Sequence, residues 1–300
     1  MLSIRHFLGY LICTMKSHRS SLLIICSLLA NYSFAVDFSA AIDQSKWTLE
    51  ESQFYCRLQH EIPSFGRGDF FHEAGEQATF ELIPTQKGSF AGGVKLVAEA
   101  SSWQPGTAPL FINNINVRSG EEIIKIAAPD TADMLVALYK GMAPTFSFQR
   151  WMGSEEGVRV SLSAANFQKS YQDYITCVDK LLPVNYRQVA RTAVLFPPAQ
   201  WRLSDATKER LDLIAQYIKA DAKVKSIYVD GHSDNAGRRL LNRDLSKQRA
   251  EEVTQYLISL GVDEKAITTR YHGERYPVVA NNNATNRARN RRVTIRLERN

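Results

Sequence analysis

The stretch DGHSDNAGRRLLNRDLSKQRAEEV, residues 230–253, decides the fold of the second half of the chain. It begins where the strand-like run 224–232 ends, passes through a glycine-containing turn and continues as an amphipathic helix pattern. Asp234 lies just after the predicted strand, and Arg249 lies on the predicted helix. We therefore expect one acid and one base on two elements that meet at the same edge of a sheet.

Strand and helix patterns continue on both sides of this stretch. The predicted strands are 192–196, 224–232, 266–273 and 291–298; the predicted helices are 204–220, with Ser204 as N-cap, and 242–261, which ends at Gly261. On the first helix, Leu211, Ile214, Ala215 and Ile218 share the expected apolar face. The order βαβαββ predicts an α+β domain over 191–300, with two helices on one face of the sheet.

The first half is expected to form a separate strand-rich, β-barrel-like domain over 36–185. Its predicted strands include 78–83, 93–100 and 157–163, and its predicted helices are 130–141 and 164–182. The apolar face expected on the last helix consists of Phe167, Tyr171, Tyr174, Ile175 and Val178. Packing against the strands explains these residues without a ligand.

Residues 1–35 have the anatomy of a secretory signal peptide. A basic start, an apolar run over 22–30 and small residues before Val36 predict cleavage after Ala35. Met15 is an alternative start codon to Met1. A membrane-spanning helix needs about 20 apolar residues, so this shorter run predicts export rather than an anchor.

Composition and charge narrow the class of protein. The chain is 44% hydrophobic and 23% charged, which is typical of a globular protein rather than a disordered one. Residues 36–190 carry 13 basic and 18 acidic side chains, whereas residues 191–300 carry 21 and 13. A basic domain can indicate a nucleic-acid partner, but export argues against one. Anions of the cell envelope and wall are the expected partners instead.

Two cysteines remain once the predicted signal peptide is removed. Cys56 and Cys177 both lie in the acidic half. In an exported chain, such a pair predicts one disulfide that ties the beginning and end of a domain together. Two separate buried thiols are the alternative.

Arg249 is predicted to point toward the domain interior. Leu245, Arg249 and Val253 share one helical face, because they follow one another at intervals of four residues. A buried guanidinium needs carboxylate partners, and Asp234 is the available one. The spacing alone leaves two interpretations open, a structural ion pair or a site for an outside ligand.

Metal and catalytic interpretations are weaker. His232 and His272 end two predicted strands, but no second carboxylate or cysteine accompanies them in a zinc-like cluster. No nucleophile motif is found either. We predict no catalytic residue, no metal site and no cofactor.

The second half resembles the OmpA-like peptidoglycan-binding domain. The matching positions are Ser233-Asp234, Gly237, Asn242, Leu245-Ser246, Arg249-Ala250, Gly273, Pro277 and Asn290-Arg291-Arg292-Val293. In that family, the aspartate and arginine hold the amine and carboxylate of diaminopimelate in the wall peptide. The resemblance implies a peptidoglycan site formed by Ser233, Asp234, Asn242, Leu245 and Arg249. The loop 196–203 departs from the family pattern at its two prolines, so the resemblance implies no contacts there.

The first half resembles the N-terminal domain of the MotY family, over 54–70, 135–151 and 166–182. That resemblance implies a non-enzymatic periplasmic protein of the polar flagellar motor, in a ring (the T ring) around the basal body. Its first half is expected to contact the basal body and a MotX-like protein, and its second half to anchor to the wall. The resemblance also implies that this assembly helps to retain stator complexes.

Other functions remain as alternatives. A generic OmpA-like envelope tether fits the second half, and a hydrolase acting on the cell wall fits it less well because no catalytic set is visible. A stator channel subunit of the MotB type needs a membrane helix with an ion-carrying acid. No Asp or Glu precedes Asp37, which excludes that type.

Overall fold

The computed structural model describes residues 36–86, 90–118, 120–151 and 157–299. The predicted signal peptide and both possible start codons lie outside these residues. Within the described residues, none of the helices combines the length and apolarity needed to cross a membrane.

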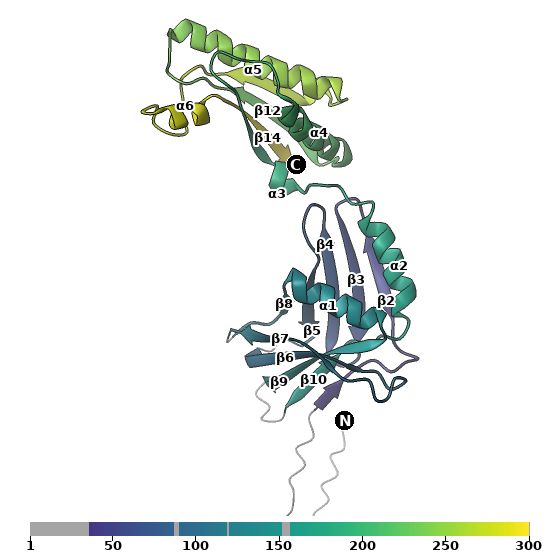
Figure 1. Ribbon diagram of the computed structural model, residues 1–300. Helices are drawn as coiled ribbons and strands as arrows, with labels where there is room; N and C mark the ends of the chain where they lie inside the picture. Colours follow the sequence, from purple (N-terminus) through teal and green to yellow (C-terminus); the bar gives the residue numbers. More distant parts are fainter. Residues whose placement is uncertain (1–35, 87–89, 119, 152–156, 300) are drawn as a thin grey trace, which may run out of the picture. The chain divides into compact units, whose positions relative to one another are not determined.

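The strand-rich half contains two five-stranded sheets (Figure 1). One sheet is antiparallel and has the order β2 (Trp47–Glu51), β3 (Tyr55–Ile62), β4 (Gly66–Glu73), β5 (Thr79–Pro84) and β8 (Ile124–Ile126). The other has the order β1 (Val36–Phe38), β10 (Val158–Ser161), β9 (Met142–Trp151), β6 (Phe90–Ala100) and β7 (Leu110–Val117), in which only β1 and β10 run parallel. The strand-rich class expected from the sequence is confirmed.

Helices α1 (Ala128–Tyr139) and α2 (Phe167–Val178) contribute to the same core as these sheets. Phe167 and Tyr174 of α2 are buried, and Tyr171 and Val178 are partly buried against the core. Ile175 is 36% exposed, so its placement on the apolar face was wrong. The reason is rotational, because each residue turns about 100° around a helix and Ile175 directly follows the inward-facing Tyr174.

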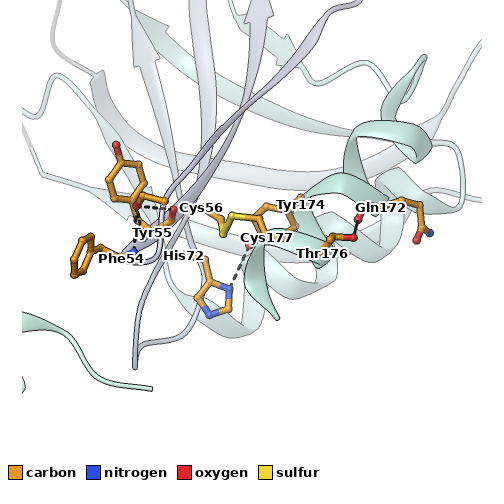
Figure 2. The surroundings of a disulfide bond; sticks show 9 residues. Phe54, Tyr55, Cys56, His72, Gln172, Tyr174, Thr176 and Cys177 are labelled. Carbon is orange, nitrogen blue, oxygen red and sulfur yellow. Dashed lines mark hydrogen bonds between the residues drawn. A yellow bond between two sulfur atoms is a disulfide. The ribbon is translucent and has the colours of Figure 1, made fainter. Parts of the chain in front are cut away.

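A disulfide between Cys56 and Cys177 joins β3 to α2 (Figure 2). Both cysteines are buried, and they lie 121 positions apart in the sequence. The predicted disulfide is therefore confirmed, and the alternative of two separate buried thiols is wrong. It ties the second strand of one sheet to the last helix of this half.

The second half is a four-stranded sheet with two long helices. The strand order is β11 (Arg191–Leu195), β14 (Arg292–Arg299), β12 (Val224–Gly231) and β13 (Ile267–Tyr271), with β12 and β13 parallel. Helices α4 (Asp205–Ala220) and α5 (Arg239–Ser259) pack against each other and share the core of this sheet. The predicted βαβαββ order is confirmed. The sequence patterns missed three short helices, α3 (Tyr186–Val189), η1 (Glu264–Ala266) and α6 (Ala284–Asn290).

The predicted start of α4 and the predicted end of α5 are confirmed, whereas α5 begins at Arg239, three residues before the predicted start at 242. The Ser204 hydroxyl accepts a hydrogen bond from the Thr207 amide at 3.3 Å, as an N-cap does. Gly261 follows α5 with φ +89°, and the Val262 amide donates to the Leu257 carbonyl at 3.2 Å. This Schellman motif needs a left-handed residue, which glycine adopts without strain. Three of the four predicted face residues of α4 are buried, and Ile218 is partly buried.

Candidate functional site

Gly231 at the end of β12 allows α5 to approach the strand directly. A Cβ atom at Gly231 would lie 2.1 Å from the Ser246 carbonyl oxygen and 3.0 Å from the Ala250 Cβ. Any larger residue would therefore push α5 away from the sheet. This close contact brings Arg249 of α5 to the chain that leaves β12.

Arg249 is fully enclosed, with an exposed fraction of 0%. Its Nε donates to the Gln200 carbonyl at 2.8 Å, its Nη1 to the His232 carbonyl at 3.2 Å and its Nη2 to the Pro197 carbonyl at 3.1 Å. Its guanidinium carbon lies 5.2 Å from the centre of the Phe196 ring, within the range of a cation–π contact. The loop 196–203, for which the resemblance implied no contacts, thus holds this arginine by its backbone.

Asp234 forms its ion pair with a different arginine. Its Oδ2 accepts from Arg291 Nη1 at 2.8 Å, and its Oδ1 accepts from the Ala236 amide at 3.2 Å. Arg291 also donates from Nε to the Phe196 carbonyl at 3.0 Å. The interpretation of Asp234 and Arg249 as a structural ion pair was therefore wrong about the partner. Arg249 donates its hydrogen bonds to backbone carbonyl groups. Arg291, which directly precedes β14, reaches the Asp234 carboxylate instead.

The site is a small cluster of charges withdrawn from water. Burial lowers the pKa of Arg249, the negative charge of Asp234 raises it, and the positive charge of Arg291 lowers it further. Two guanidinium groups thus share one nearby carboxylate. A guanidinium has five N–H donors, and carbonyl groups take three of those on Arg249. Such a cluster can accept one further anionic group and offers a carboxylate to a cationic one.

Two family models match the chain in succession. The MotY N-terminal domain matches residues 38–183, and the OmpA family matches residues 195–291. The sodium-type flagellar protein MotY of Vibrio parahaemolyticus is 30% identical over 283 residues, which cover 92% of this chain and 96% of that protein. This chain belongs to the MotY family. The family membership and the OmpA-like domain expected from the sequence are confirmed.

Other relatives match a shorter part of this MotY-family chain. The peptidoglycan-binding protein ArfA of Mycobacterium tuberculosis is 39% identical over 95 residues, or 31% of this chain and 28% of that protein. The solved structure of the peptidoglycan-associated lipoprotein from Burkholderia pseudomallei is 27% identical and aligns with a TM-score of 0.34. It covers 35% of this chain and 89% of that one.

The other predicted site residues of this MotY-family chain lie at different distances from the charge cluster. Ser233 is 2% exposed, and its hydroxyl has no hydrogen-bond partner among the described residues. Asn242 is buried and donates to Glu274 at 3.0 Å, so it holds the loop after β13. Leu245 is half-buried. The structure brings Asp234, Arg249 and Arg291 together, and the sequence analysis missed Arg291 as a site residue although the matched motif contains it.

His232 contributes to the charge cluster through its backbone carbonyl, and its ring packs against another histidine. Its carbonyl holds Arg249, and its ring stacks on His272 with the ring centres 5.0 Å apart. Burial, together with the positive charge of Arg292 and the neighbouring His272, lowers the pKa of His232 to about 4, so the ring is neutral at neutral pH. The described residues hold no group of three or more His, Cys, Asp or Glu side chains placed to bind a metal ion.

Proposed function

We propose that this chain is a non-enzymatic, periplasmic structural component of the flagellar motor that is anchored to peptidoglycan by its OmpA-like half. The observation that carries the proposal is the cluster of the buried Arg249 and Asp234 with the partly buried Arg291. Burying charges costs stability unless each charge is matched, and apolar residues of similar volume serve a core at least as well. A charge cluster in this position is explained by a charged ligand.

The proposed ligand is the diaminopimelate side chain of the wall peptide, which ends in an amine and a carboxylate. Asp234 would accept the amine, and Arg249 would bind the carboxylate in a charge-assisted contact. The Ser233 hydroxyl, for which the described part of the chain supplies no hydrogen-bond partner, lies next to Asp234 in the sequence and would supply a further polar contact. Asn242 and Leu245 complete the proposed site by supporting its edge on α5.

Binding would require Arg249 and Asp234 to exchange their present partners for the ligand. Arg249 is fully covered, so a ligand carboxylate reaches it only when the loop 196–203 gives up at least one carbonyl contact. Pro197 and Gln200 are exposed members of that loop, and Ala199 between them has the strained φ of +53°. An ionic acceptor makes a stronger hydrogen bond to a guanidinium than a neutral carbonyl does, which favours the exchange.

The strand-rich half is proposed to attach the chain to the flagellar basal body, together with a MotX-like protein, and so to help retain stator complexes. The similarity to a protein named as a flagellar MotY over 92% of the chain supports this role. In this proposal, 36–185 is the basal-body domain and 191–300 is the wall domain. A chain that binds wall but never accompanies basal bodies would instead be a general envelope tether.

Co-sedimentation with purified cell-wall sacculi tests the wall role. We expect the full chain to sediment with sacculi, and the Asp234→Asn and Arg249→Lys variants to remain in the supernatant. Asp205→Asn and Arg191→Lys are matched controls, because both residues are exposed and belong to other parts of the same half. Circular dichroism shows whether each variant is folded. Undiminished sedimentation of both folded site variants would overturn the site assignment.

A further inference from the structure

The strand-rich half has a hollow of about 640 Å³ that the wall-binding role does not use. The segment before β2 contributes Lys46, the turn after β6 contributes Trp103, the end of α1 contributes Lys140, and the start of α2 contributes Lys169. Four separate parts of the fold therefore meet around one concave surface.

The hollow is positively charged on an acidic half. Lys46, Lys140 and Lys169 are all exposed, and no acidic side chain occurs among the residues that line the hollow. Within the described residues, none of these three lysines forms an ion pair. Residues 36–190 as a whole carry more acidic than basic side chains. A local positive surface on such a background favours an anionic partner.

Side-chain amides fix the rim of the hollow. Gln104 donates to the Lys140 carbonyl at 3.1 Å, Gln168 to the Tyr139 carbonyl at 3.2 Å, and Asn166 to the Ser45 carbonyl at 3.0 Å. These bonds join the end of α1 and the start of α2 to their neighbouring loops. A rim held in this way loses little conformational freedom when a partner binds.

An aromatic surface lies beside the charges. Trp103 is 44% exposed, whereas Trp47 and Phe167 on the wall of the same hollow are buried. Exposed tryptophan in a concave surface is typical of the residues that contribute most to protein interfaces. The combination fits a segment that carries both carboxylates and an apolar side chain.

We infer that this hollow docks an acidic segment of another protein, which contributes aspartate or glutamate to the lysines and an apolar side chain to Trp103. The inference rests on the proposed function, in which this half attaches the chain to the motor. It adds the surface that makes the attachment and the chemistry of the partner. The concave shape and its limited volume favour a polypeptide segment over a membrane surface.

Charge reversal in the full chain tests the inference. The variant Lys46→Glu/Lys140→Glu/Lys169→Glu is compared with Lys95→Glu/Arg118→Glu/Lys180→Glu, which makes the same charge change at exposed positions of the same half that do not line the hollow. We expect the first variant to sediment with sacculi normally but to accompany isolated basal bodies about tenfold less, as lost charge pairs at an interface predict. The second variant should behave like the unchanged chain.

The outcomes separate the two proposals. Normal recovery of the first variant with basal bodies overturns the docking surface and leaves the proposed function intact. Failure of the unchanged chain to accompany basal bodies overturns the proposed function itself. A photo-crosslinking residue in place of Trp103 adds a direct measurement. A crosslink to an acidic segment of another protein, lost with the three lysines, supports the inference; a crosslink to a second copy of this chain or to lipid overturns it.

Discussion

In the strand-rich half, aromatic rings such as Phe70, Phe80 and Phe146 fill the interior, and a disulfide closes it. The OmpA-like half has no cysteine and encloses the Arg249 guanidinium completely, beside the buried Asp234. The strand-rich half also buries a carboxylate, Asp69, but the arginine paired with it, Arg67, lies at the surface. Apolar burial and a crosslink stabilise a fold directly, whereas buried charges do so only when their partners compensate the loss of water. We interpret the difference as an interior organised for stability in the first half and, in part, for the proposed ligand in the second.

The largest expected effect concerns the disulfide. Replacing both Cys56 and Cys177 by serine should lower the free energy of unfolding of the strand-rich half by about 4–5 kcal/mol, because the unfolded chain regains the freedom of a long loop. Hydrogen exchange measured peptide by peptide should show faster exchange in β3 and α2 and no change in β12 and α5. Equal acceleration in both halves would contradict their separate stabilisation.

Removal of the buried guanidinium should have the next largest effect, in the opposite half. Arg249→Met leaves the carbonyl groups of Pro197, Gln200 and His232 without their donor. We expect a loss of roughly 3–4 kcal/mol, detected as faster exchange in β12 and α5 only. Arg191→Met, at an exposed position, is the control. Unchanged exchange in the Arg249→Met variant would show that the carbonyl contacts contribute nothing.

Acid should destabilise both halves, because each buries one neutral histidine. Burial lowers the pKa of His60 and of His232 to about 4, from 6.5. Between these values the unfolded chain binds more protons, so the stability present above about pH 6.5 falls as the pH falls toward 4, by up to about 3 kcal/mol for each histidine. Denaturant unfolding between pH 7 and pH 4.5 measures this slope. A stability that stays constant over that range would contradict it.

The smallest effect distinguishes the helix starts of the two halves. Ser204→Ala removes the side-chain cap of α4 and should cost about 1 kcal/mol. In the strand-rich half, the N-cap residue of α1 is Ala127, which provides no side-chain cap, so Ala127→Gly should change the stability much less. Thermal unfolding of the two variants compares these effects. Equal shifts of the unfolding temperature would show that the Ser204 cap contributes no stability of its own.

The sequence predicts local features better than contacts between distant segments. Ser204, Gly261 and the inward face of Arg249 follow from neighbouring residues, and the structure confirms each. Strand β4 was not predicted because Gly66 and Gly68 interrupt its alternation, although a Cβ at Gly68 would lie only 2.8 Å from the Phe80 ring. Glycine is required there by packing that no local pattern reveals.

The site residues were also harder to predict where they depend on contacts between distant segments. The partner of Asp234 could not be read from spacing, because Arg291 is 57 residues away and reaches the carboxylate only through the pairing of β14 with β12. Helix α6 lacks an apolar period, so it too was missed. The matched sequence motif does contain Arg291, but only the structure shows which of the motif positions form the charge cluster.

The most direct measurement of the central claim is a calorimetric titration of the full chain with two soluble muropeptides. One contains diaminopimelate, and the other contains lysine, which keeps the side-chain amine but lacks the second carboxylate. We expect the diaminopimelate peptide to bind roughly tenfold or more tightly than the lysine peptide, and Asp234→Asn and Arg249→Lys each to remove this preference. Equal affinity for the two peptides in the unchanged chain would contradict it.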